Sequence, residues 1–193
     1  MADGGARVGA VVLAAGAGTR LGGVAKALLR GADDVAFLAR IVETAAAAGV
    51  AAADVVVVVA APFADEVATL ARRLGAGVVV NPAPARGMAS SVALGYAALA
   101  PAVDAAFLWP VDHPRVAPST LIALVARGEG VPVCGGRGGH PPLVPRRLFA
   151  SLARCADLPG GARDVVRALA RLPVDDPAVI EDIDLPADLE RAC

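Results

Sequence analysis

The chain has 193 residues, of which 56% are hydrophobic, so it is long enough for one large domain and too short for two independent ones. Its 18 basic residues nearly balance its 19 acidic residues, which argues against a general nucleic-acid or membrane-surface binder. The three cysteines form no CxxC pair and are odd in number, which favours a reducing, cytoplasmic location over a disulfide framework. We therefore expect a single soluble domain over residues 1–193, without a signal segment or a membrane span.

Apolar runs alternate with amphipathic stretches along the first two thirds of the chain. Short Val-rich runs bounded by Gly, Pro or Asp predict buried strands, and the stretches between them predict helices. The expected strands are residues 8–13, 54–60, 76–80, 105–110 and 131–134; the expected helices are residues 35–48, 62–74, 88–99 and 118–126. This alternation predicts a three-layer, Rossmann-like α/β fold with helices on both faces of a mostly parallel sheet.

The last third of the chain is less regular. Residues 135–142 (GGRGGHPP) predict a loop, and residues 143–155 lead into a helix. A second helix is expected to open after Gly161 and to cover GGARDVVRALARL. The closing segment EDIDLPADLERAC predicts a carboxylate-rich strand end, followed by a helix that Pro186 starts.

The first expected strand ends in a glycine-rich loop that carries two cations, VVLAAGAGTRLGGVAKALL. Gly16 and Gly18 permit positive φ and let backbone amides approach an anion, and Arg20 and Lys26 add positive charge. This composition predicts a phosphate-binding loop. It is neither the dinucleotide fingerprint, which requires glycine where Leu21 stands, nor a P-loop, whose lysine is absent. A plain strand-to-helix turn with solvated cations is the alternative.

The string LAAGAGTRLGGVAKALL resembles the signature loop of the nucleotidyltransferases that include molybdenum cofactor cytidylyltransferase, the related guanylyltransferase and sugar-1-phosphate nucleotidyltransferases. The resemblance implies the fold of nucleotide-diphospho-sugar transferases and a single nucleotidyltransferase domain. It assigns the nucleotide-binding residues Leu13, Ala14, Ala15, Gly16 and Gly18. It also implies that Arg20 and Lys26 meet the phosphates.

A second motif, NPAPARGMASSVALG, is similar to the family segment in which a GM or GL pair precedes serines at the start of a helix. From their position, Ser90 and Ser91 are expected to cap that helix or to meet a ligand at its N-terminus. The resemblance assigns Ser91 to the base side of the nucleotide.

Two aspartates are the expected metal ligands. FLWPVDHPRV stands where the family has a strand ending in GD, and a carboxylate at that end of a strand points into the crevice where open α/β sheets bind ligands. Mg²⁺ takes one or two carboxylates together with phosphate oxygens and water, so Asp112 is the expected first ligand. Asp184, in EDIDLPADL, matches the second ligand of the family's closing DxDTPxDL motif. The alternative for each aspartate is that it caps a turn or a helix.

The segments expected on the acceptor side resemble the family motifs in part and depart from them at several positions. GRGGHPPLVPR resembles the acceptor-side loop and strand of the molybdenum cofactor cytidylyltransferases, which assigns His140 to the acceptor; a surface histidine before a turn is the alternative. LPGGARDVV resembles the family's GDxGAR helix start, but the acid is absent, with Gly160 or Gly161 in its place. Beside the expected metal ligand, Val111 replaces the usual Gly and His113 replaces Gln or Met.

These motifs imply a Mg²⁺-dependent transferase in which an acceptor phosphate oxygen attacks the α-phosphorus of a nucleoside triphosphate and pyrophosphate leaves. An ionised phosphate is already a nucleophile, so the site needs charge neutralisation and alignment; Lys26, Arg20 and Asp112 are the expected catalytic residues. Ala15 is typical of the cytidylyl and uridylyl branches, so CTP is the expected triphosphate. The GMASSV and GGHPPL strings favour molybdopterin as acceptor, and the resemblance implies a molybdoenzyme or its chaperone as a partner.

Three alternatives stay open from the sequence. A sugar- or polyol-phosphate cytidylyl- or uridylyltransferase differs only on the acceptor side. A non-catalytic nucleotide-binding module would not need two acids around one ion. A zinc site from Cys134, His113 and His140 lacks a recognisable ligand spacing.

Overall fold

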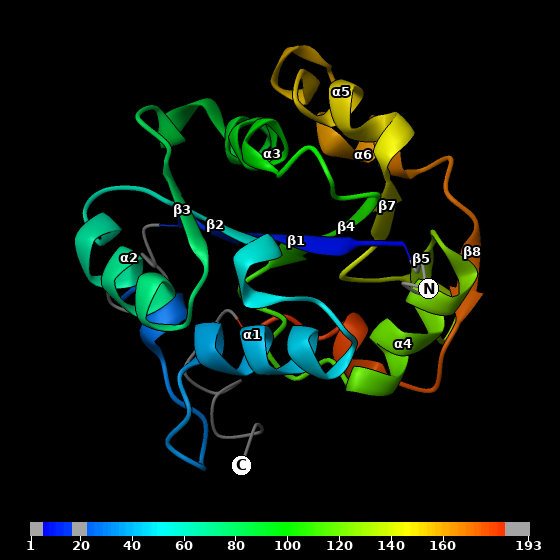
Figure 1. Ribbon diagram of the computed structural model, residues 1–193, viewed down its shortest axis with the longest axis horizontal. Coiled ribbons are helices and arrows are strands. Elements are labelled where there is room, and N and C mark those ends of the chain that lie inside the picture. Colours follow the sequence, from blue (N-terminus) through cyan, green and yellow to red (C-terminus); the bar gives the residue numbers. More distant parts are fainter. Residues whose placement is uncertain (1–5, 17–22, 184–193) are drawn as a thin grey trace, which may run out of the picture.

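A five-stranded sheet forms the centre of the molecule (Figure 1). The structure is a computed structural model that describes residues 6–16 and 23–183. The strand order is β3-β2-β1-β4-β7, with β1 (Val8–Ala14), β2 (Val55–Val59), β3 (Gly77–Val80), β4 (Ala105–Pro110) and β7 (Leu143–Pro145). The first four strands run parallel, and β7 pairs antiparallel with β4.

Alternate side chains of the central strands enter two separate cores. Val12, Val57 and Trp109 are completely buried on one face, which is covered by α1 (Phe37–Ala47), α2 (Ala64–Arg73) and α4 (Pro118–Arg127). The opposite face packs against α3 (Met88–Ala98), α5 (Phe149–Leu152) and α6 (Ala162–Val166), which lie above the sheet in Figure 1. Because both faces are covered, the strands read as continuous apolar runs. The expected α/β fold with a mostly parallel sheet is confirmed.

The start of α4 is held by a residue far along the chain. Pro118 occupies the first turn of the helix, where its missing N–H is not needed, and Ala117 before it has no capping side chain. The buried carboxylate of Asp176 accepts hydrogen bonds from the Ala117 N–H at 2.9 Å and from the Thr120 hydroxyl at 2.7 Å. The segment after β8 is thereby tied to the helix layer beneath the sheet.

A second, three-stranded sheet was not expected. It has the order β6-β5-β8 and consists of β5 (Val131–Cys134), β6 (Arg137–Gly138) and β8 (Arg171–Pro173). The helix expected after Gly161 therefore ends at Val166, and its predicted second half is wrong, because Leu172 pairs in parallel with Pro132 of β5. Likewise, the expected loop over residues 135–142 contains β6. Strand pairing over a long sequence separation has overridden the local helical pattern.

Short 3₁₀ turns link the main elements: η2 (Lys26–Leu28), η3 (Ala52–Asp54), η4 (Pro84–Arg86), η5 (Arg146–Leu148), η6 (Cys155–Asp157) and η7 (Pro177–Val179). The expected C-terminal helix lies outside the described residues. Within the described part of the chain, every helix is too short or too polar to cross a membrane.

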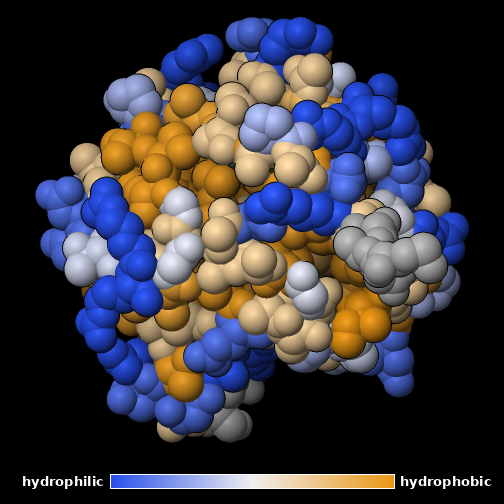
Figure 2. Space-filling view, viewed as in Figure 1, coloured by the Kyte–Doolittle hydropathy of each residue, from blue (hydrophilic) through white to orange (hydrophobic). Residues whose placement is uncertain are grey.

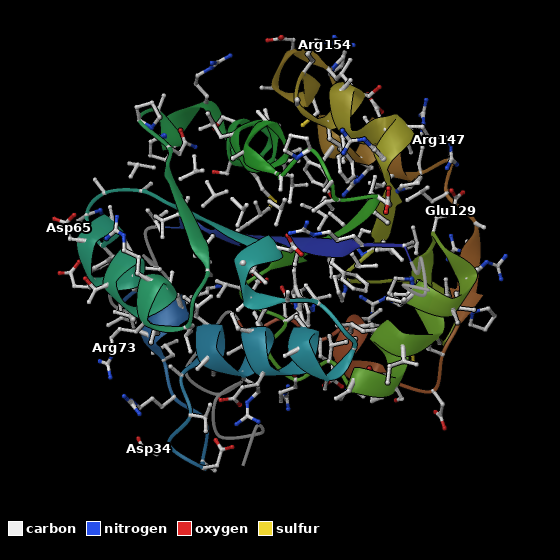
Figure 3. The ribbon with its side chains drawn as sticks, in the orientation of Figure 1. Asp34, Asp65, Arg73, Glu129, Arg147 and Arg154 are labelled. Atoms are coloured by element: carbon white, nitrogen blue, oxygen red, sulfur yellow. The ribbon has the colours of Figure 1, made fainter. Side chains whose placement is uncertain are left out.

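Polar and apolar surface are separated on the face seen in Figure 2. Apolar surface gathers beside β3 and α3, whereas hydrophilic residues cover α2 and the region around α5. Figure 3 shows Arg147 and Glu129 pointing toward each other, with the Arg147 Nη2 donating to Glu129 Oε1 at 2.8 Å. The guanidinium lowers the pKa of the Glu129 carboxyl, and this pair links η5 to the turn that follows α4.

Candidate functional site

A cavity of about 430 Å³ opens where β1 and β4 end. Parallel strands leave such a crevice at their carboxyl ends, because the chain departs there toward the helices on either side. We call it cavity 1. Its lining comprises Leu13, Ala14, Ala15, Gly16, Lys26, Ala61, Pro84, Ala85, Gly87, Met88, Ser91, Pro110, Val111 and Asp112. Most of the residues that the sequence assigns to the nucleotide therefore line one cavity, whereas Gly18 and Arg20 lie outside the described residues.

Asp112 stands at the wall of cavity 1, directly after β4, and its two carboxylate oxygens have different surroundings. Oδ2 lies 3.4 Å from Nζ of Lys26 on η2, and the two side chains are 24% and 17% exposed. Oδ1 is buried and has no hydrogen-bond partner among the described residues. A buried carboxylate oxygen without a donor suits a divalent cation that prefers oxygen ligands.

The described residues alone do not enclose a metal ion. No group of three or more His, Cys, Asp or Glu side chains in the described part of the chain could hold one, so the zinc alternative has no structural support. Asp184, the expected second ligand, lies outside the described residues. A divalent cation would thus depend on Asp112, on residues beyond those described and on oxygens of a bound ligand, which is the manner in which Mg²⁺ is usually held.

Ser90 and Ser91 do not cap α3, contrary to one of the two sequence expectations. The N-cap position is Gly87, whose φ of 90° lies in the left-handed region that favours glycine. The hydroxyl of Ser90 donates to the Gly87 carbonyl oxygen at 2.7 Å. Ser91 lies one residue further into the helix, is 5% exposed and lines cavity 1, as its assignment to the nucleotide requires.

A second cavity of about 620 Å³ adjoins the first. Leu13, Met88 and Pro110 line both, so the two spaces meet at the ends of β1 and β4. We call the second one cavity 2. Its remaining lining is Ala89, Val92, Leu108, Val131, Gly138, Gly139, His140, Pro142, Gly160, Gly161, Ala162, Arg163, Val166, Arg167, Leu169 and Arg171. Among these described residues the charges are three arginines, and no carboxylate, amide or hydroxyl side chain is present.

Residues 10–173 match the MobA-like NTP transferase domain. The chain belongs to this family. No curated protein matches the sequence significantly. The family match agrees with the position of cavity 1, where the glycine-rich loop of the domain begins.

Solved structures of similar proteins share this fold over nearly the whole length. Rv0371c from Mycobacterium tuberculosis H37Rv is 28% identical, with 97% of each chain covered and a TM-score of 0.78. A structure of Rv0371c in complex with manganese is 25% identical over 96% of this chain and 97% of that one, with a TM-score of 0.72. Molybdopterin-guanine dinucleotide biosynthesis protein A from Archaeoglobus fulgidus is 17% identical over 96% of each chain, with a TM-score of 0.63, and shows the fold alone.

Two histidines lie close to Asp112 in this MobA-like domain. The rings of His113 and His140 have centroids 5.0 Å apart, and His113 Nε2 lies 3.9 Å from Asp112 Oδ1. Burial, followed by the electrostatic interaction with the His113 ring, lowers the pKa of His140 to about 4. His140 is therefore neutral near pH 7. It lines cavity 2, and its Nδ1 has no partner among the described residues.

The glycine pair that replaces the family acid has a carboxylate next to it. Gly160 donates its N–H to Asp164 Oδ2 at 2.9 Å. A Cβ at position 160 would lie 2.5 Å from Asp164 Oδ1, so the Asp164 side chain fills the space that a side chain at 160 would need. The MobA-like domain thus has an acid beside this turn, although the expected position lacks one.

Sequence reasoning missed two groups of residues around the site. The arginines of cavity 2 repeat every fourth residue, at 163, 167 and 171, and this spacing was the available signal. Asn81 follows β3 and donates hydrogen bonds from Nδ2 to both Ser90 Oγ and Ser91 Oγ at 2.9 Å. Nothing local in the sequence marks Asn81 as a partner of these serines.

Proposed function

We propose that this chain transfers CMP from CTP to the phosphate of molybdopterin, with release of pyrophosphate. The main support is that cavity 1, which holds the Lys26–Asp112 pair, shares the lining residues Leu13, Met88 and Pro110 with cavity 2. A nucleotide in cavity 1 and a phosphate-bearing acceptor in cavity 2 would bring the attacking oxygen and the α-phosphorus together at that junction. Such alignment is a large part of catalysis when the nucleophile is already ionised.

The chain would stabilise the reaction through charge and position. The backbone at residues 13–16 would contact the base and ribose, and Lys26, with Arg20, would neutralise charge on the α-phosphate and the departing pyrophosphate. Asp112 and Asp184 would hold a divalent cation, expected to be Mg²⁺, which supplies further charge neutralisation when bound. The manganese complex of Rv0371c supports a divalent cation in proteins of this kind. Ala15, by its family resemblance, supports a pyrimidine nucleotide.

The lining of cavity 2 supports molybdopterin over a sugar or polyol phosphate. Val92, Leu108, Val131 and Leu169 offer apolar contact area for a flat heterocycle. The three arginines match an anionic acceptor, because guanidinium groups bind phosphate through paired hydrogen bonds. A sugar would need acids, amides or hydroxyls to pair with its own hydroxyls, and the described lining of cavity 2 contains no such side chain.

A pyrophosphate-release assay tests the proposal. The purified protein is incubated with each of ATP, CTP, GTP and UTP, with Mg²⁺ or Mn²⁺, and with molybdopterin, a sugar phosphate, a polyol phosphate or no acceptor. We expect release only with molybdopterin and fastest with CTP. Release with a sugar or polyol phosphate but not with molybdopterin would overturn the acceptor, preference for GTP would overturn the nucleotide, and no release in any mixture would favour a non-catalytic binding module.

A further inference from the structure

A buried amide joins the end of β3 to the start of α3. Asn81 directly follows β3, is 3% exposed, and its backbone N–H donates to the Val59 carbonyl at 2.7 Å. Its side-chain Nδ2 donates to the hydroxyls of Ser90 and Ser91, both at 2.9 Å. Ser91 alone of these three residues lines cavity 1.

The direction of each hydrogen bond in this cluster follows from one backbone group. The Ala83 N–H donates to the Asn81 side chain at 2.9 Å, and because the NH₂ nitrogen of an amide cannot accept a hydrogen bond, the accepting atom is Oδ1. The other end of the amide, which faces the serines, is therefore the NH₂ group. An NH₂ group only donates, so both serine oxygens act as acceptors toward Asn81.

The two serine hydroxyls differ in the hydrogen bond that each can donate. The Ser90 hydroxyl donates its one hydrogen bond to the Gly87 carbonyl oxygen at 2.7 Å, so it has no further donor capacity. Ser91 accepts from Asn81, and within the described part of the chain its own proton has no acceptor. Because Ser91 is buried and lines cavity 1, its hydroxyl can donate that proton to a molecule in the cavity or to water there.

We infer that Asn81 is a positioning residue that makes Ser91 a fixed hydrogen-bond donor to an acceptor atom of the nucleobase, such as a ring nitrogen or a carbonyl oxygen. This inference rests on the proposed nucleotide-binding role of cavity 1. A freely rotating serine hydroxyl donates or accepts with equal ease. The bond from Asn81 occupies one of the two lone pairs of Ser91 Oγ and excludes Asn81 as an acceptor, so the Ser91 O–H is left to donate to a base that presents an acceptor to cavity 1.

The variant Asn81→Asp tests the inference with almost no change in shape. At pH 8 a carboxylate can still accept from the Ala83 N–H, but it cannot donate, so it would draw the Ser91 proton away from the cavity. Affinity for the triphosphate that the wild type binds most tightly is measured by titration calorimetry, with Mg²⁺ present, for wild type, N81D, S91A and the double variant N81D/S91A. We expect N81D and S91A each to weaken binding about tenfold, and the double variant to bind no more weakly than S91A.

The matched control is Ser90→Ala, because Ser90 receives the same amide donor but does not border cavity 1. We expect S90A to change affinity by less than about twofold. Unchanged affinity in N81D, an equal additional loss from N81D in the S91A background, or a loss in S90A as large as in S91A would each overturn the inference. If the wild type binds none of the four triphosphates, the proposed function fails as well, which separates the two failures.

Discussion

The unequal surroundings of the two Asp112 oxygens suggest how to separate binding from turnover. Replacing Asp112 by Asn preserves the shape of the side chain but removes its negative charge, both from the buried Oδ1 and from the Oδ2 that lies near Lys26. We expect turnover to fall at least about a hundredfold, because cation binding at this wall matters most when charge develops on the phosphates. CTP affinity should stay within about tenfold, since the base and ribose contacts are untouched. Single-turnover pyrophosphate release and titration calorimetry measure the two quantities.

Asp65→Asn is the matched control for this change. Asp65 is exposed on α2, at the edge of the molecule in Figure 3, and lines neither cavity. The substitution Asp65→Asn removes one negative charge, as Asp112→Asn does, so any effect of net charge on turnover appears in both variants. Wild-type turnover in Asp112→Asn would remove Asp112 from the mechanism.

At the scale of elements, the packing of α3 on the sheet determines where Ser91 lies. Gly95 lets α3 approach closely: a Cβ at this position would be 2.2 Å from Val11 Cγ1 and 3.0 Å from Val58 Cγ2. Alanine raises helix propensity by about 1 kcal/mol, whereas overpacking of a tight core costs about 1–3 kcal/mol. We expect Gly95→Ala to lower the free energy of unfolding, measured by urea denaturation, despite its better helix propensity.

A second substitution tests whether the clash is the cause. Val11→Ala removes the methyl group that an alanine at 95 would meet, so the double variant should be more stable than the sum of the two single changes predicts. Strict additivity would mean that Gly95 matters for some reason other than its contact with β1. An increase in stability from Gly95→Ala alone would contradict the close approach of helix and sheet.

At the scale of the whole molecule, His140 makes stability depend on pH. Its pKa is about 4 in the folded protein, mainly because of burial, against about 6.5 in an unfolded chain. Between these values the unfolded chain binds more protons, so the free energy of unfolding falls as the pH falls. From pH 7 to pH 5 this amounts to about 2 kcal/mol.

The variant His140→Gln isolates this contribution. Urea denaturation at pH 7 and pH 5 gives the loss of stability for each protein, and carboxylates that titrate in the same range affect both alike. We expect the loss to be about 2 kcal/mol smaller in the variant. An identical pH dependence in the two proteins would mean that the pKa of His140 is the same in the folded and the unfolded chain.

The sheet and its covering helices could be predicted because their signals are local. Strands such as β2 and β4 are buried on both faces, so they read as unbroken apolar runs, and Pro118 marks the start of α4. The glycine-rich loop after β1 was recognisable for the same reason, since glycines, which can adopt positive φ, and cations occur together within a few residues of the sequence. Ser91, Lys26 and Asp112 line one cavity, and their roles in binding and catalysis remain predictions.

What the sequence by itself determined is the alternation of strands and helices and the family to which the chain belongs. Only the tertiary structure decided that Leu172 pairs with β5 instead of continuing a helix, that three arginines surround cavity 2, and that Asn81 orients Ser91. The physical reason is the same in each case. Local patterns record which surfaces must be buried, but strand partners, charge clusters and hydrogen-bond directions depend on which distant segments meet in the folded chain.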